Sequence, residues 1–123
     1  MRDRTLWTWH IGAGVVILVL LGLHMAIMHL SRTLGISGPE PTAWGSVAAR
    51  AESAFFTVTY VILLGAALYH GLYGFRNILL ELNPGPGIRR FVTVGLTVAG
   101  LGLFIFGTWA ALAAPGAALG LGG

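Results

Sequence analysis

Residues 53–80 read SAFFTVTYVILLGAALYHGLYGFRNILL, a run in which Arg76 is the only charged side chain. A helix needs about 20 predominantly apolar residues to cross the hydrocarbon core of a bilayer. Two further runs are long enough, one from Trp7 to Leu30 and one from Phe91 to Ala114. A span in lipid must satisfy its backbone polar groups internally, and none of the three shows the alternation of a membrane β-strand. The sequence therefore predicts an all-α integral membrane bundle with spans at about 7–30, 53–80 and 91–114.

The composition agrees with lipid as the solvent of this chain. Of its 123 residues, 56% are hydrophobic and 9% are charged, and the mean hydropathy is +0.84. Soluble domains carry about 25% charged residues, so this chain has too few to cover a water-facing surface. We expect one membrane domain over residues 1–123. The absence of cysteine excludes disulfides, thiolate metal sites and cysteine nucleophiles.

The segments between the spans carry helix-breaking residues. The linker Ser31–Ala51 contains Gly35, Gly38, Pro39 and Pro41 and is expected to be irregular. The second linker, Asn83-Pro84-Gly85-Pro86-Gly87, predicts a tight turn. From Pro115 onward the tail is almost entirely Gly, Ala and Leu, and it is expected to fray.

The basic residues are all arginines and lie at the ends of the apolar runs. Two lie in the first linker, Arg32 and Arg50. The other five flank the N-terminus and the second turn: Arg2, Arg4, Arg76, Arg89 and Arg90. The positive-inside rule then places the N-terminus and the second turn inside. We interpret the arginines as topology signals and not as nucleic-acid contacts. With no cleavable signal or transit peptide predicted, the expected location is a prokaryotic cell (inner) membrane.

Four histidines lie within or at the edge of the predicted spans: His10, His24, His29 and His70. Ionisable residues inside a membrane are costly and are functional candidates by default. The alternative for each is a histidine that bonds to a neighbouring helix or reaches the interface.

His70 begins the segment His70-Gly71-Leu72-Tyr73-Gly74-Phe75-Arg76-Asn77. Gly74 lies one helical turn after His70 on the same face, and it removes a side chain that would collide with a porphyrin ring. Arg76 lies about 9 Å along the axis, within reach of a haem propionate. A ligand, clearance and a counter-charge in one segment predict haem ligation by His70.

His70, Gly74, Arg76 and Glu81 together resemble the second helix of succinate dehydrogenase and fumarate reductase membrane anchor subunits. The resemblance implies a non-catalytic anchor whose histidine is an axial ligand of haem b, with the arginine near the propionates. It implies a second anchor subunit, an iron–sulfur subunit and a flavoprotein subunit as partners, and quinone or menaquinone as the electron acceptor or donor.

The same resemblance suggests roles for further residues. His24 is the candidate for a second haem, with His29 as a weaker alternative. Trp9, His10 and Glu81 are candidates for the quinone pocket, although Trp7, Trp9 and His10 also fit an aromatic belt at the membrane boundary.

Several alternatives stay open. Leu82 stands where many D-type anchors have tyrosine, and residues 9–14 lack the serine of many C-type anchors, so either type is possible and the D type is favoured. A rival function is a structural transmembrane subunit without cofactor. Another is the cytochrome b subunit of a different quinone-linked dehydrogenase.

Overall fold

The computed structural model describes residues 2–35 and 38–118, and the described residues contain helices and no strand. The first long helix is α1 (Arg2–Met25), which a π-helical segment (Ala26–Leu30) and the short α2 (Ser31–Thr33) continue. The other two are α4 (Ala54–Glu81) and α5 (Pro86–Ala118). Within the described ranges, three helices are long and apolar enough to cross a membrane, which confirms the predicted fold class.

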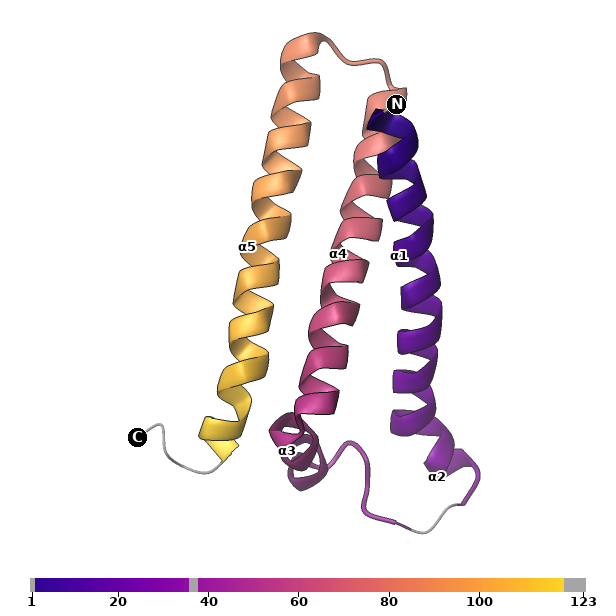
Figure 1. Cartoon of the computed structure of the whole chain (residues 1–123), viewed down its shortest axis with the longest axis vertical. Coiled ribbons are helices and arrows are strands. Elements are labelled where there is room, and N and C mark those ends of the chain that lie inside the picture. Colours follow the sequence, from indigo (N-terminus) through magenta and orange to yellow (C-terminus); the bar gives the residue numbers. More distant parts are fainter. Residues whose placement is uncertain (1, 36–37, 119–123) are drawn as a thin grey trace.

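The three long helices lie side by side, with α4 in the middle (Figure 1). α4 packs against α1 on one side and against α5 on the other, whereas α1 and α5 do not pack on each other within the described residues. α1 and α4 run antiparallel, so the N-terminus lies at the same end of the bundle as the turn between α4 and α5 (Figure 1).

Glycines on one helix receive large side chains from the other along the α4–α5 interface. A Cβ atom added to Gly107 would lie 2.5 Å from Cδ2 of Leu64, and one added to Gly100 would lie 2.7 Å from Cδ1 of Leu72. In lipid, helix association depends on such close packing because burial from water no longer drives it. These contacts set the register of α4 against α5.

The second linker is the predicted tight turn. Asn83 has a φ of 51°, the left-handed conformation that asparagine adopts readily just after a helix ends. α5 begins at Pro86, which suits the first helical position because proline has no amide hydrogen to leave unpaired.

The first linker is more ordered than the sequence analysis predicted. It contains the helix α3 (Trp44–Glu52), which packs against α4 and α5. Its Ala, Arg and Glu residues favour helix, and the neighbouring prolines and glycines obscured that signal. Arg50 donates through Nη2 to the carbonyl of Pro41 and to the sulfur of Met28, 3.3 Å away, and so ties the linker to the end of the first long helix.

The expectation of fraying from Pro115 was wrong for four residues, because the backbone of α5 stays helical to Ala118. Residues 119–123 lie outside the described part of the chain.

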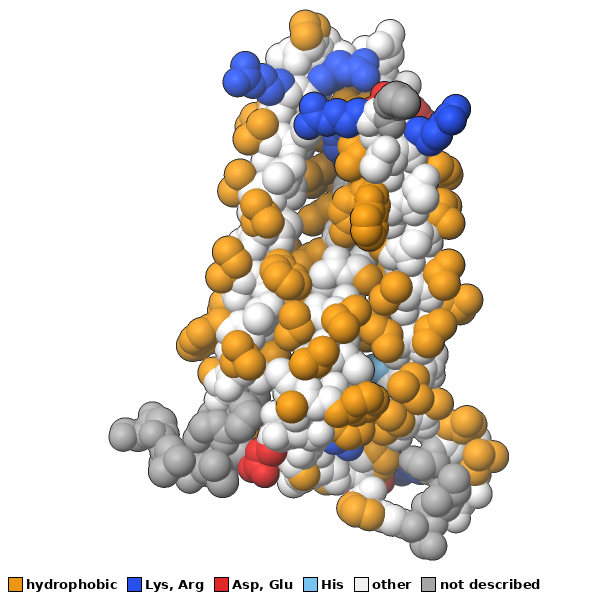
Figure 2. Space-filling view, viewed as in Figure 1, with side chains coloured by type: hydrophobic (Ala, Val, Ile, Leu, Met, Phe, Trp, Pro, Cys, Tyr) orange, Lys and Arg blue, Asp and Glu red, His pale blue; other side chains and the backbone are white. Residues whose placement is uncertain are grey.

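The surface of the bundle is apolar over its length and basic at one end. Figure 2 shows arginine side chains gathered mostly at the end with the N-terminus, and hydrophobic side chains along the body. No hydrophobic side chain among the described residues is buried. The chain is thus a single layer of helices that offers its apolar faces to lipid or to other subunits.

Candidate functional site

The candidate site centres on two histidines that α1 and α4 bring face to face. The rings of His10 and His70 stack, with centroids 4.1 Å apart and planes 4° apart. His10 is 8% exposed and is the only buried residue in the described part of the chain. The sequence analysis assigned these residues to different roles, and the antiparallel packing of α1 and α4 makes them neighbours.

One nitrogen of His70 is held by the backbone of α1. Nδ1 of His70 lies 3.0 Å from the carbonyl oxygen of His10. A carbonyl can only accept, so this contact requires the hydrogen on Nδ1, and in the neutral imidazole it leaves a lone pair on Nε2. The structure records no partner for Nε2 among the described residues. Such a bond at the other ring nitrogen typically sets which nitrogen of a histidine can bind metal.

Gly14 makes this contact possible. A Cβ atom at Gly14 would lie 3.1 Å from Cε1 and 3.2 Å from Nδ1 of His70. In an α-helix the carbonyl of His10 also accepts from the amide of Gly14, so ring and amide share one acceptor. The sequence analysis did not single out this glycine, because its partner lies 56 positions away on another helix.

The surface beside Gly74 is occupied by His10. A Cβ atom at Gly74 would lie 3.3 Å from Cε1 of the His10 ring. Nδ1 of His10 is buried and has no hydrogen-bond partner in the described residues. Gly74 thus leaves the space beside the helix that was predicted for a porphyrin, and the ring of His10 occupies this space in the structure.

Two tyrosines of α4 flank the histidine pair. The ring centroid of Tyr73 lies 5.3 Å from that of His10, and Tyr69 stacks on Tyr73 with centroids 5.6 Å apart. The hydroxyl of Tyr69 donates to the carbonyl of Leu6, 2.9 Å away, and so links α4 to the start of α1. Both tyrosines also line a groove between α4 and α5.

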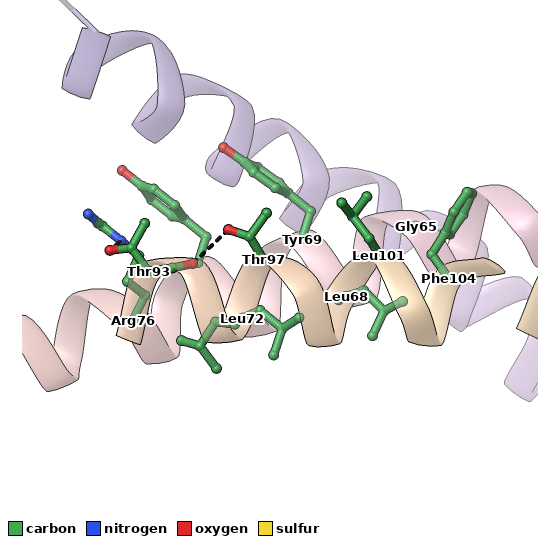
Figure 3. Close-up of a pocket in the computed structure, with 12 residues that line it drawn as sticks. Gly65, Leu68, Tyr69, Leu72, Arg76, Thr93, Thr97, Leu101 and Phe104 are labelled. Carbon is green, nitrogen blue, oxygen red and sulfur yellow. Dashed lines mark hydrogen bonds between the residues drawn. The ribbon is translucent and has the colours of Figure 1, made fainter. Parts of the chain in front are cut away.

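Arg76 lies in that groove and not beside His70. Its Nε donates to the hydroxyl of Thr93 at 2.9 Å, and its Nη1 donates to the side-chain oxygen of Asn77 at 3.3 Å. The groove has a volume of about 400 Å³. Figure 3 shows Arg76 and Thr93 at one end and Gly65 and Phe104 toward the other. Sequence reasoning missed Thr93, whose pairing with Arg76 depends on the α4–α5 packing.

His24 and His29 lie apart from this pair. His24 makes an edge contact with Tyr60, their centroids 5.7 Å apart. Tyr60 precedes His70 by ten residues on α4, or about 15 Å along the axis. His29 is exposed in the π-helical segment, and its carbonyl accepts a hydrogen bond from Thr33.

The other two quinone-pocket candidates are on the outside of the bundle. Trp9 is 69% exposed, and Glu81, the last residue of α4, is also exposed. The structure brings neither side chain into contact with the buried ring of His10. A pocket that contains all three would therefore need surfaces from another chain.

The described residues contain no group of three or more His, Cys, Asp or Glu side chains that could hold a metal ion. A haem needs less from a chain, because its four equatorial nitrogens belong to the porphyrin. One free imidazole nitrogen on each of two chains would be enough for the protein to hold the iron. The donor chemistry of His70 fits that requirement.

Comparison with known proteins gives one informative relative. The chain is 25% identical over 103 residues to the succinate dehydrogenase hydrophobic membrane anchor subunit of Archaeoglobus fulgidus. That alignment covers 84% of this chain and 83% of the relative. No protein-family model matches the chain, and no solved structure matches it. The likeness covers most of the chain and, with the three long apolar helices, supports a multi-pass membrane protein related to such anchors.

Proposed function

We propose that this chain is a membrane anchor subunit of a succinate dehydrogenase or fumarate reductase complex, and that His70 is an axial ligand of haem b. The proposal rests on the likeness to the Archaeoglobus fulgidus anchor and on the environment of His70. Within this proposal, chemistry on the dicarboxylate belongs to a flavoprotein partner.

The observation that carries the haem assignment is the 3.0 Å contact between Nδ1 of His70 and the carbonyl of His10. It fixes the ring and directs the ring hydrogen toward α1. Nε2 is then the nitrogen left to bind iron. A bound haem would supply one-electron transfer between the iron–sulfur subunit and the quinone pool.

This chain's contribution is to hold the imidazole in one orientation within a site of low dielectric. The His10 carbonyl orients the ligand, and Gly14 permits the approach of the two helices. A second anchor subunit would provide the other histidine that holds the haem. Such an anchor works with an iron–sulfur and a flavoprotein subunit, and it belongs in a prokaryotic cell membrane with the N-terminus inside.

Quinone binding is part of the same proposal. The His10–Tyr73 contact joins the histidine pair to the stacked rings of Tyr73 and Tyr69. Trp9 and Glu81 are exposed and are available to a pocket completed by another subunit.

A cofactor-free structural subunit is the second candidate, and one observation favours it. The ring of His10 covers the surface beside Gly74 and stacks on His70, so the pair can also be explained as helix packing. In that case His70 is satisfied by the carbonyl of His10 and by stacking alone.

The deciding experiment is to purify the complex through a tag on this chain, identify the co-purifying subunits and record reduced-minus-oxidised visible spectra. We expect a flavoprotein, an iron–sulfur protein and a second anchor, with a b-type α band that His70→Ala abolishes. His29→Ala is the comparison variant, because it removes an exposed histidine that is also the weaker candidate for a second haem. A band that survives in this variant and is lost with His70→Ala assigns the band to His70. A complex with no b-type band, or with one that His70→Ala leaves unchanged, would favour the structural subunit.

A further inference from the structure

We infer that the groove between α4 and α5 is a binding site for one anionic phospholipid, with its phosphate on Arg76 and one acyl chain along the groove. This site is separate from the histidine pair and does not depend on haem. The argument rests on the charge of Arg76, the shape of the groove and the basic end of the bundle.

Arg76 is a half-buried cation with no counter-ion in the part of the chain that the structure describes. The one salt bridge among the described residues joins Arg32 to Glu40, at the other end of the bundle. The two recorded partners of Arg76, Thr93 and Asn77, are neutral. A charge at membrane depth requires pairing or solvation, and a guanidinium has a fork of donors suited to phosphate oxygens.

The two threonine hydroxyl groups near Arg76 donate to backbone carbonyls. Thr93 donates to the carbonyl of Arg89 at 2.9 Å, and Thr97 donates to the carbonyl of Thr93 at 2.7 Å. Nη2 of Arg76 and the hydroxyl of Tyr73 have no recorded partner in the described part of the chain. The unpaired groups at this end therefore include a charged donor, the guanidinium of Arg76, and this charge favours an anionic acceptor.

The rest of the groove has the length and polarity of an acyl-chain site. From Arg76 to Gly65 the groove runs along eleven residues of α4, or about 16 Å. That is close to half of the roughly 30 Å hydrocarbon thickness, which one leaflet occupies. Beyond Arg76 and Thr93 the walls are mainly apolar, with Leu72, Leu96 and Phe104 among them.

The position of Arg76 matches the depth of a lipid headgroup. It lies five residues before Glu81, the last residue of α4, or about 7.5 Å from the helix end. Arg89 lies one turn before Thr93 on the same side of α5, nearer the membrane surface. Basic pockets of this kind between transmembrane helices attract anionic headgroups. The charge therefore favours a phospholipid over a neutral quinone or an apolar helix.

The test uses the whole complex reconstituted in vesicles that contain a photoactivatable phosphatidylglycerol with a diazirine in its acyl chain. The same acyl chain on phosphatidylcholine is the comparison probe. Cross-linked peptides are identified by mass spectrometry. We expect the phosphatidylglycerol probe to label α5 residues 96–104 preferentially, and Arg76→Gln to lower this labelling about fivefold, the effect of one basic group near a membrane surface.

Arg90→Gln is the matched control. It removes the same charge at the same end of the bundle, but Arg90 lies on a different face of α5 and does not line this groove. We expect it to leave the labelling of residues 96–104 unchanged. A second variant, Leu96→Trp, fills the groove while keeping Arg76, and it should lower labelling by both probes.

Four results would overturn the inference. Equal labelling by the two probes, or an equal loss with Arg90→Gln, would show that the groove has no specific anion site. Displacement of the probe by added quinone would assign the groove to quinone. Loss of haem from Arg76→Gln with unchanged lipid labelling would show that Arg76 pairs with a haem propionate and not with a lipid. Haem content is measured on the same samples, so failure of the haem proposal leaves the lipid result interpretable.

Discussion

Nδ1 of His70 lies 3.0 Å from the backbone carbonyl of His10, while the two rings stack 4.1 Å apart. The acceptor is therefore a backbone atom, and the stacking partner is the side chain of the same residue. This separation matters because the two contacts can be removed independently. Substitution of His10 removes the stacking and keeps the carbonyl, whereas a change at Gly14 displaces the ring from the carbonyl.

Gly14→Ala is predicted to disturb His70. The new Cβ would lie 3.1 Å from Cε1 of the ring, so the ring or the helix must move. Loss of an orienting partner typically weakens metal affinity by about 10- to 100-fold, and we expect haem retention to fall accordingly. Titration of haem into the reconstituted apo-complex measures this. Gly12→Ala is the control, because nothing lies within 4 Å of the added methyl group, and a similar loss there would contradict the prediction.

His10→Ala is predicted to keep the b-type spectrum. The substitution leaves the main-chain carbonyl that orients His70 and opens the surface beside Gly74. Haem content should stay at the wild-type level, measured as haem per flavin in the purified complex. Loss of the spectrum would instead assign His10 as a ligand, through its own ring.

Gly107→Ala is predicted to weaken the packing of α4 on α5. Its methyl group would lie 2.5 Å from Cδ2 of Leu64, an overlap that must displace the leucine or the helix. Overpacking of this kind costs about 1–3 kcal/mol. Unfolding of the chain in mixed micelles with increasing denaturing detergent measures the change. Gly102→Ala is the control, since its added methyl group meets nothing within 4 Å, and it should leave the midpoint in place.

The arginine distribution predicts the orientation in the membrane. The chain has no cysteine, so single cysteines can be introduced without background. Gly85→Cys, in the turn between α4 and α5, should react with a membrane-impermeant maleimide only after the cells are opened. Gly38→Cys, in the first linker, should react in intact cells. The reverse pattern would place the N-terminus outside.

The architecture was predictable because each span is a long local run. The solvent of the chain follows from its composition, and the helical state of each run follows from the need to satisfy backbone groups in lipid. The turn at Asn83 and Pro86 was likewise encoded locally. The helix α3 was missed because its short helix-forming stretch lies next to prolines and glycines in a linker.

Less of the candidate site than of the fold could be predicted from the sequence. The sequence alone identified His70 and Gly74 as neighbours on one face, because they lie on one helix at a fixed spacing. The partners of these residues depend on the register of antiparallel helices, which distant glycines and side chains set together. Only the tertiary structure could place His10 against His70 and direct Arg76 toward Thr93 on the opposite side of α4. Spacing within one helix is fixed by its geometry, whereas contacts between helices depend on packing that no single segment encodes.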